Sequence, residues 1–171
     1  MPTWCPARRR SWCLARSEHA DAILAWMQQS PFSRGWVPEA GQPQDVLTGW
    51  MRDPDTSCWV VEDDGVPVAY GTIWDDPKEG EAELAHLVVD PARRGRGHGR
   101  ALVLALAQIA ARPGRRVVLR IDPHNDRALA VYVSCHFAIL SDAEQEQFNA
   151  QQPQLWLARQ PAGQASSTPT R

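Results

Sequence analysis

The sequence predicts an α/β domain of the α+β type, with a mixed, mostly antiparallel sheet of six to seven strands and helices on both faces. In the first half, short runs rich in Val, Trp and Tyr flank the turn Asp63-Asp64-Gly65, which is typical of an antiparallel hairpin. In the second half, apolar runs alternate with helical patterns, which is typical of crossover connections. Together these patterns favour one sheet with helices packed on both sides.

The elements of the first half follow from capping and stop signals. A strand is predicted near 12–16, and Ser17 can then cap a helix that runs to about residue 29. Pro43 is a favoured first-turn residue for a second helix, which Asp53-Pro54 ends. Three strands are then predicted, over 57–62, 67–74 and 82–89.

The second half begins with a helix that follows a glycine-rich turn and runs to about residue 111, where Pro113-Gly114 ends it. The remaining pattern predicts a strand, a helix and two further strands, over 116–121, 125–134, 137–140 and 154–158.

Composition bounds the class of protein. The chain has 171 residues, of which 43% are hydrophobic and 22% charged, and its formal net charge is -2. A domain of this size can bury a core without disulfides, and its balanced charge argues against a nucleic-acid binder of the strongly basic kind. The four cysteines form no C-x-x-C pair and have no histidine at ligand spacing, so we predict no metal site and expect reduced thiols.

We expect one compact domain over residues 12–160, between disordered ends at 1–11 and 161–171. The N-terminal end has two prolines and an arginine triplet, and the C-terminal end is rich in Gln, Ser and Pro. The longest uncharged apolar stretch, 101–111, has eleven residues, whereas a membrane span needs about 20. We therefore expect a cytoplasmic protein with no membrane partner.

A glycine- and arginine-rich turn, residues 93–100, lies between the strand at 82–89 and the helix that follows it. A glycine turn between a strand and a helix N-terminus favours phosphate binding, because unpaired N–H groups point outward and the helix dipole adds about half a positive charge. The segment lacks a Gly-Lys-Ser/Thr ending, and only Asp122 stands near the place of a dinucleotide-site acid, so neither of those fingerprints fits. A tight turn with solvated arginines is the alternative interpretation.

The residues around this turn resemble the GNAT family of acyl-CoA-dependent N-acetyltransferases. Arg94, Gly97 and Gly99 occupy the signature positions of the family's pyrophosphate loop, and the segment from Asn125 to Tyr132 is similar to its Asn-x-x-Ala-x-x-x-Tyr helix. The resemblance, which covers 82–140 well, implies that the fourth and fifth strands splay apart and that acetyl-CoA binds there, with no metal. The cofactor-binding residues that it implies are Leu87, Val88, Val89, Arg94, Gly95, Arg96, Gly97, His98, Gly99, Arg100 and Asn125.

Acyl transfer to an amine needs a base, since an alkylamine is almost wholly protonated at pH 7. Glu83 is the first candidate, because strict alternation places it on an apolar strand face with Ala85, Leu87 and Val89, which would raise its pKa. The resemblance also places the family's strand glutamate there. An exposed carboxylate is the alternative. Glu81 and His86 are reserve candidates, and alternation places His86 on the opposite face.

The leaving thiolate needs a proton donor, and Tyr132 is the candidate because it lies two helical turns after Asn125 on the same face. A core tyrosine is the alternative, and Asn125 can equally be a plain helix cap. Cys135 is a weak candidate nucleophile, because its only nearby histidine is the adjacent His136. The family usually has glycine at position 136, where a helix ends in a left-handed residue, so we expect strain or an altered turn there.

The distribution of charged residues along the chain suggests what kind of acceptor substrate the protein uses. Residues 62–90 contain nine acidic side chains and one lysine, whereas residues 93–127 contain nine arginines and two acids. A basic half beside an acidic half would suit an anionic cofactor and a small cationic amine. The equal alternative is that the acidic residues lie in surface turns and only keep the protein soluble. Trp36 is the best candidate for lining an acceptor pocket.

We therefore expect direct attack in a ternary complex on the primary amine of a small molecule. A protein N-terminal or lysine acetyltransferase and a noncatalytic CoA- or anion-binding domain are the alternatives. No nucleic-acid partner is expected, and a homodimer is left open.

Overall fold

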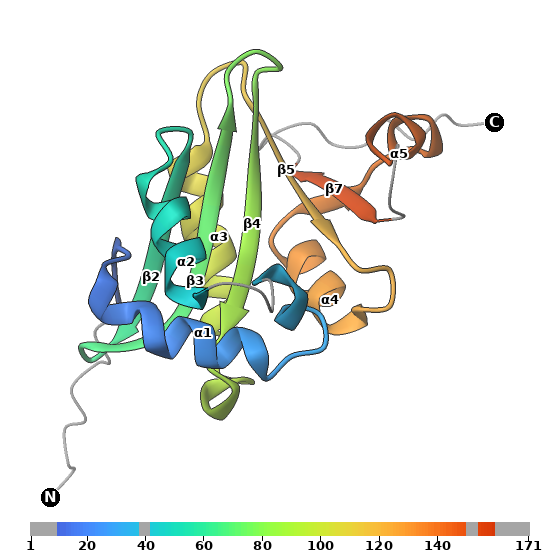
Figure 1. Cartoon of the computed structure of the whole chain (residues 1–171). Helices are drawn as coiled ribbons and strands as arrows, with labels where there is room; N and C mark the ends of the chain where they lie inside the picture. Colours follow the sequence, from blue (N-terminus) through green and yellow to red (C-terminus); the bar gives the residue numbers. More distant parts are fainter. Residues whose placement is uncertain (1–9, 38–41, 150–153, 160–171) are drawn as a thin grey trace, which may run out of the picture.

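The computed structural model describes residues 10–37, 42–149 and 154–159, which form one sheet covered by helices (Figure 1). The strands are β1 (Arg10–Leu14), β2 (Thr56–Asp63), β3 (Val66–Asp76), β4 (Glu81–Val89), β5 (Arg116–Ile121), β6 (Phe137–Ile139) and β7 (Leu155–Arg159). The helices are α1 (Ala20–Gln28), α2 (Pro43–Arg52), α3 (His98–Ala110), α4 (Asp126–Ser134) and α5 (Asp142–Phe148), with 3-10 turns η1 (Ser17–His19), η2 (Arg34–Trp36) and η3 (Pro91–Arg93).

The predicted disordered ends fall largely on 1–9 and 160–171, which lie outside the described residues. β1 begins at Arg10, so Arg10 and Ser11 belong to the sheet rather than to the predicted extension. None of the helices in the described ranges has the length and apolar character of a membrane span.

The strands lie in the order β1-β2-β3-β4-β5-β7-β6, and every neighbouring pair is antiparallel except β4 and β5, which are parallel. The predicted mixed, mostly antiparallel sheet is therefore confirmed. The hairpin between β2 and β3 turns through Asp64 and Gly65, whose φ angles of 52° and 76° are those that a tight two-residue hairpin requires.

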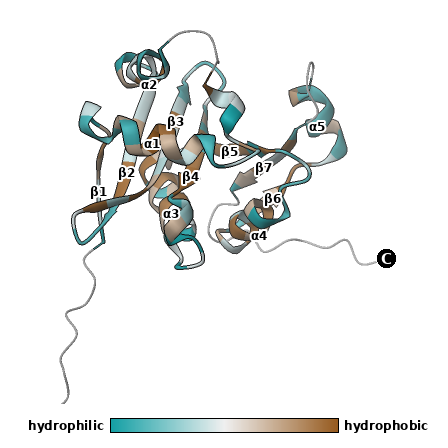
Figure 2. Ribbon diagram, turned by 60° about the horizontal axis from the view of Figure 1, so that its bottom comes forward, coloured by the Kyte–Doolittle hydropathy of each residue, from teal (hydrophilic) through white to brown (hydrophobic). Residues whose placement is uncertain are grey.

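Helices cover both faces of the sheet, as predicted. α3 and α4 pack on one face over the largest apolar cluster, and α1 and α2 pack on the other. α5 lies on the same side as α1 and α2, at the far end of the sheet, over a small cluster of Val118, Leu140 and Trp156 (Figure 2). The face that carries α1, α2 and α5 is therefore walled at both ends by helices.

α5 differs from the prediction, which had no helix between residues 140 and 154. Its local signal is a capping box, in which Glu144 Oε2 accepts hydrogen bonds from the Ser141 N–H at 3.1 Å and the Ser141 hydroxyl at 2.8 Å. The helix has only seven residues and most of them are polar, so it has little apolar periodicity by which it could be recognised.

β4 and β5 separate soon after they meet. They pair only through Glu81, Ala82 and Glu83, which face Arg116, Val117 and Val118. Beyond Glu83, β4 continues to Val89 without β5 as its neighbour, so its backbone on that side has no strand partner within the described ranges. This confirms the predicted splay of the fourth and fifth strands.

A β-bulge in β4 changes which side chains share a face. Thr72 pairs with Ala85 and Tyr70 pairs with Val88, so Gly71 alone lies opposite both His86 and Leu87. His86 has a left-handed φ of 51°, which places the extra residue there.

Strict alternation along β4 is therefore wrong beyond residue 85. Before the bulge the even-numbered Leu84 packs with α3, and after it the odd-numbered Leu87 and Val89 pack with α3. Glu83 lies opposite Trp74, on the other face, and His86 contacts Thr72 and Trp74 on that same face. Glu83 and His86 consequently share the face that carries α1, α2 and α5.

Candidate active site

A cavity of about 1150 Å³ opens where β4 and β5 diverge. Both predicted catalytic residues line it, as do all of the predicted cofactor-binding residues except Arg96, which is exposed outside it. Its walls also come from η2, β3, α4 and β7. The fold thus brings distant predicted residues into one place.

The glycine turn forms one end of the cavity. Gly95 and Gly97 have left-handed φ angles of 77° and 80°, and a Cβ at either position would meet no atom within 4 Å. Gly97 is the N-cap of the 13-residue helix α3 and, as a glycine, has no side chain with which to cap it. The first N–H groups of α3 therefore keep hydrogen-bonding capacity beside open space, which fits a diphosphate.

Two residues of the turn do not behave as expected. The His98 side chain is buried, and its Nε2 lies 3.9 Å from Asp63 Oδ2, behind the turn. Burial lowers the pKa of His98. Only the backbone of His98 can therefore serve a ligand in the cavity, while the Arg96 guanidinium can act there only from outside the cavity wall.

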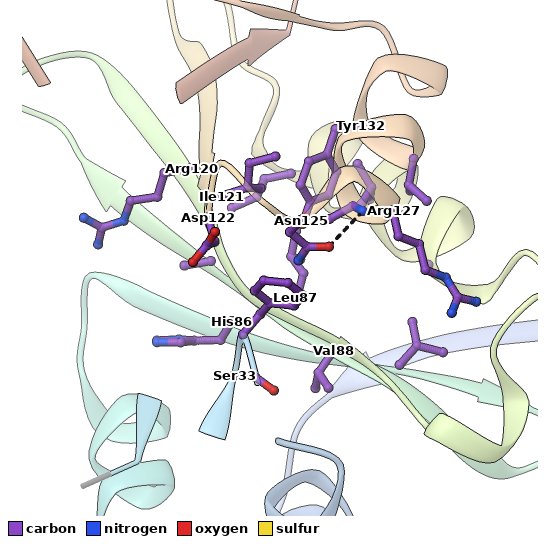
Figure 3. A pocket seen from close by; sticks show the side chains of 18 of the residues that line it. Ser33, His86, Leu87, Val88, Arg120, Ile121, Asp122, Asn125, Arg127 and Tyr132 are labelled. Atoms are coloured by element: carbon purple, nitrogen blue, oxygen red, sulfur yellow. Dashed lines mark hydrogen bonds between the residues drawn. The ribbon is translucent and has the colours of Figure 1, made fainter. Parts of the chain in front are cut away.

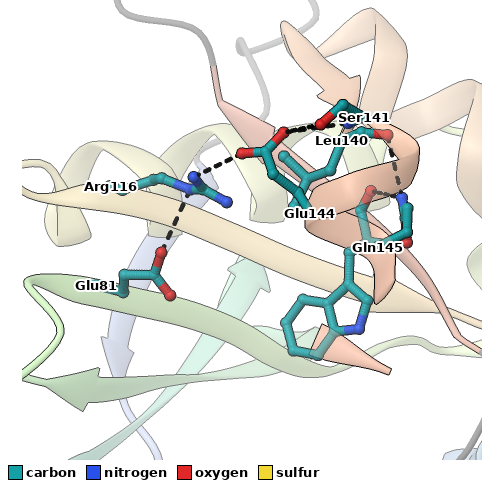
Figure 4. A network of polar contacts seen from close by, with 7 residues as sticks. Glu81, Arg116, Leu140, Ser141, Glu144 and Gln145 are labelled. Carbon is teal, nitrogen blue, oxygen red and sulfur yellow. Dashed lines mark hydrogen bonds and ion pairs between the residues drawn. The ribbon is translucent and has the colours of Figure 1, made fainter. Parts of the chain in front are cut away.

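Glu83 lies at the point where the strands part. Its Oε1 is 2.9 Å from Arg120 Nε on β5, and only 16% of its side chain is exposed. Burial raises the pKa of Glu83, and the Arg120 charge opposes this rise. Glu81, the first reserve base, instead pairs with Arg116 at 3.3 Å and does not line the cavity (Figure 4).

His86 lines the cavity among three tryptophans. Its ring stacks on Trp50 with centroids 3.8 Å apart, and it makes edge contacts with Trp36 at 5.2 Å and Trp74 at 5.0 Å. Burial, with the Arg120 charge, lowers the pKa of His86 to about 4. The imidazole is thus neutral at physiological pH.

A hydrogen-bond relay fixes the tautomer of His86. The Thr72 hydroxyl donates its proton to the Ala85 carbonyl at 3.0 Å, so Thr72 Oγ1 can only accept from His86 Nδ1, 3.2 Å away. The ring proton therefore sits on Nδ1. Nε2 is left with a lone pair and is a hydrogen-bond acceptor.

Tyr132 and Asn125 approach the cavity from α4 (Figure 3). The Tyr132 hydroxyl makes no hydrogen bond to any described residue, and burial raises its pKa, so it remains a protonated donor. Asn125 Oδ1 accepts the Ala128 N–H at 3.2 Å as the cap of α4, which leaves its amide N–H groups available.

Cys135 and His136 lie at the end of α4, away from the cavity lining. Cys135 is fully buried, and burial raises the pKa of its thiol, which disfavours a nucleophilic thiolate. His136 has a left-handed φ of 67°, so the expected strain at this glycine-like position is confirmed.

A cluster that the sequence pattern did not indicate lies elsewhere, where Cys13, His19 and Glu62 bring their ligand atoms within 4.8 Å of one another. His19 Nδ1 accepts the Arg16 N–H at 3.0 Å, so in a neutral ring the proton is on Nε2. That nitrogen then faces Glu62 as a donor rather than as a metal ligand. These three side chains are therefore interpreted as a polar contact between His19 and Glu62 with Cys13 beside it, and not as a metal site.

A family model described as the acetyltransferase (GNAT) family matches residues 20–137. This chain belongs to the GNAT family. Its curated relatives include the mycothiol acetyltransferases of Beutenbergia cavernae, 41% identical over 114 residues, and Streptomyces griseus subsp. griseus, 34% identical over 119 residues. These alignments cover 63% and 69% of this chain but only 38% and 36% of the relatives, so the chain spans little more than a third of their length.

A solved structure with the same fold is yncA from Salmonella typhimurium, determined with its cofactor acetyl-CoA. It superimposes with a TM-score of 0.68 at 18% identity, covering 94% of this chain and 99% of that one. The predicted GNAT fold is thereby confirmed.

The main site residue that the GNAT resemblance did not indicate is Arg120. The sequence contains it only as one of nine arginines in 93–127, and its contact with Glu83 depends on the register of β4 against β5. Trp156 of β7, which lines the cavity together with Trp74 of β3, was missed for the same reason, since it comes from a distant strand.

Proposed function

We propose that this chain is an N-acetyltransferase that moves the acetyl group of acetyl-CoA to the primary amine of a small molecule, by direct attack in a ternary complex. The observation that carries the proposal is the meeting of the uncapped N-terminus of α3 with the divergence of β4 and β5 in one cavity. The names of the curated relatives and the acetyl-CoA bound to yncA support it.

The glycine turn and nearby charges would hold the cofactor. The N–H groups at the start of α3 face open space beside Gly97, and Arg94, Arg100 and Arg127 line the same cavity. Helix N–H groups and arginines together suit a diphosphate. The unpaired edge of β4 around Leu87 to Val89 offers backbone groups to an extended arm and to a carbonyl oxygen.

Glu83 and Tyr132 would move the two protons of the reaction. When bound, acetyl-CoA supplies the activated thioester. The Glu83 carboxylate, kept near an arginine and away from bulk water, takes a proton from the acceptor amine directly or through water. The Tyr132 hydroxyl, which has no protein acceptor among the described residues, gives a proton to the leaving thiolate sulfur. The tyrosinate left behind would recover a proton from the attacking nitrogen, directly or through water, so that this nitrogen loses its second proton.

Aromatic side chains favour a small acceptor over a protein substrate. Trp36 and Trp74 line one side of the cavity, while Phe148 and Trp156 line the other. A protein lysine or N-terminus would need an open groove between these walls. The aromatic lining therefore suits a small molecule better.

The test measures cofactor binding and catalysis separately. Calorimetry with CoA should show binding, and a panel of small amines with acetyl-CoA should give amine-dependent thiol release and a product heavier by one acetyl group in mass spectrometry. Binding without any amine-dependent release would leave a noncatalytic CoA-binding domain. Failure of both measurements would reject the proposal.

A further inference from the structure

We propose that the acceptor carries a carboxylate beside its amine, and that Arg120 binds this carboxylate. The inference rests on the proposed acetyltransferase function and names the class of its substrate: a small amino acid or an amine with a similarly placed carboxylate. It replaces the purely cationic amine that the charge order of the sequence favours.

Arg120 presents an unused edge to the cavity. Its Nε lies 2.9 Å from Glu83 Oε1, yet 43% of its side chain is exposed. Nη1 and Nη2 make no hydrogen bond to any described residue, although Arg120 lines the cavity. A guanidinium held on one edge and open on the other matches the two oxygens of a carboxylate.

Two indoles hold the guanidinium in place. Arg120 Cζ lies 5.3 Å from the ring centroid of Trp156 and 6.0 Å from that of Trp74. Trp156 is itself fixed, because its backbone N–H and carbonyl both bond to the Gln145 side chain of α5. An arginine ordered in advance loses less conformational entropy when it binds an anion.

Few of the chain's acidic side chains reach the cavity. Of the nine acidic residues in 62–90, only Glu83 lines the cavity, and it is already paired with Arg120. Asp122 also lines the cavity, but its Oδ1 accepts the His124 N–H at 2.8 Å. Arg120 and Glu83 therefore place one positive and one negative side chain together at the splay, which complements the two charges of a zwitterion.

His86 supplies a place for the amine end. It shares a sheet face with Glu83, and Figure 3 shows its side chain and that of Arg120 extending to the same side of the splayed strands. Both residues contact the same indole, Trp74. The His86 Nε2 lone pair can accept an N–H of the acceptor, which would leave the carboxylate for Arg120.

The test compares matched acceptors, such as L-leucine with 3-methylbutylamine and L-alanine with ethylamine, by amine-dependent thiol release. The readout is the ratio of kcat/KM for the amino acid to that for the amine lacking the carboxylate. Arg120→Leu should lower this ratio ~10²-fold, since two charge-assisted hydrogen bonds are lost. Loss of Arg120 also changes the surroundings of Glu83, but this change acts on both acceptors and cancels in the ratio. The difference in basicity between the two amines is the same for every variant and cancels when the ratios are compared.

Two further variants make the result specific. Arg120→Lys keeps the positive charge but lacks the planar pair of N–H donors, so it should lower the ratio ~10-fold. This variant also provides a test if Arg120→Leu does not fold. Arg127→Leu, on the cofactor side of the same cavity, should raise the KM for acetyl-CoA and leave the ratio unchanged. An unchanged ratio in both Arg120 variants overturns the inference while keeping the function, whereas no turnover of any amine by the wild type rejects the function and this inference with it.

Discussion

Replacing Gly97 with valine should remove CoA binding through a local change in the turn before α3. Gly97 has φ 80°, and open space lies beside it where a side chain would stand. Left-handed backbone costs an ordinary residue about 1–2 kcal/mol, and the valine methyl groups would occupy the space that a diphosphate needs. Charge-assisted hydrogen bonds contribute about 1.5–3 kcal/mol each, so losing two should raise the Kd for CoA ~10²–10⁴-fold.

Gly65→Val is the matched control for this experiment. Gly65 has φ 76° and equally open surroundings, but it lies in the hairpin between β2 and β3 and does not line the cavity. Both variants should lose similar stability in thermal unfolding, and only Gly97→Val should lose CoA binding in calorimetry. Wild-type affinity in Gly97→Val, or an equal loss in both variants, would refute the role of the turn.

Three further predictions concern the chemistry and the end of α4. Because burial raises the pKa of Glu83, its base form is lost on acidification at a higher pH than that of an exposed glutamate, so the acidic limb of kcat/KM should lie above the ordinary carboxyl range. This limb should flatten in Glu83→Gln, and a limb that does not move would assign the base to another group. Tyr132→Phe should lower kcat ~10²-fold with KM little changed; a fall in Tm without a fall in rate would make Tyr132 a packing residue only. His136→Gly relieves a left-handed φ of 67° and should raise the free energy of unfolding by about 1 kcal/mol in chemical denaturation, whereas no gain would mean that the side chain compensates for the strain.

The elements with strong local signals could be predicted from the sequence. Pro43 begins α2 and Asp53 follows its last residue, and the strand over 116–121 has the predicted bounds. These features depend on a few neighbouring residues. The missed helix α5 also had a local signal in Ser141 and Glu144, but its polar composition offers no apolar face to support it.

The features that could not be predicted depend on pairing between distant segments. The face of His86 follows from Gly71 lying opposite two residues of β4, which no alternation pattern along β4 can show. The Glu83 contact with Arg120 likewise requires the register of β4 against β5. The glycine turn lines the cavity, whereas the His98 side chain turns away from it, which the resemblance did not indicate.

The bulge at His86 has a consequence for how the length of β4 can vary. Deleting His86 would remove the bulge, and Leu87 and Val89 would keep their places in the α3 core while Val88 stayed on the face of α1 and α2. The strand can therefore lose its extra residue there without exchanging the interior with the wall of the cavity. A single-residue insertion elsewhere in β4 would instead turn the apolar side chains beyond it to the opposite face, and we expect it to be tolerated far worse than this deletion.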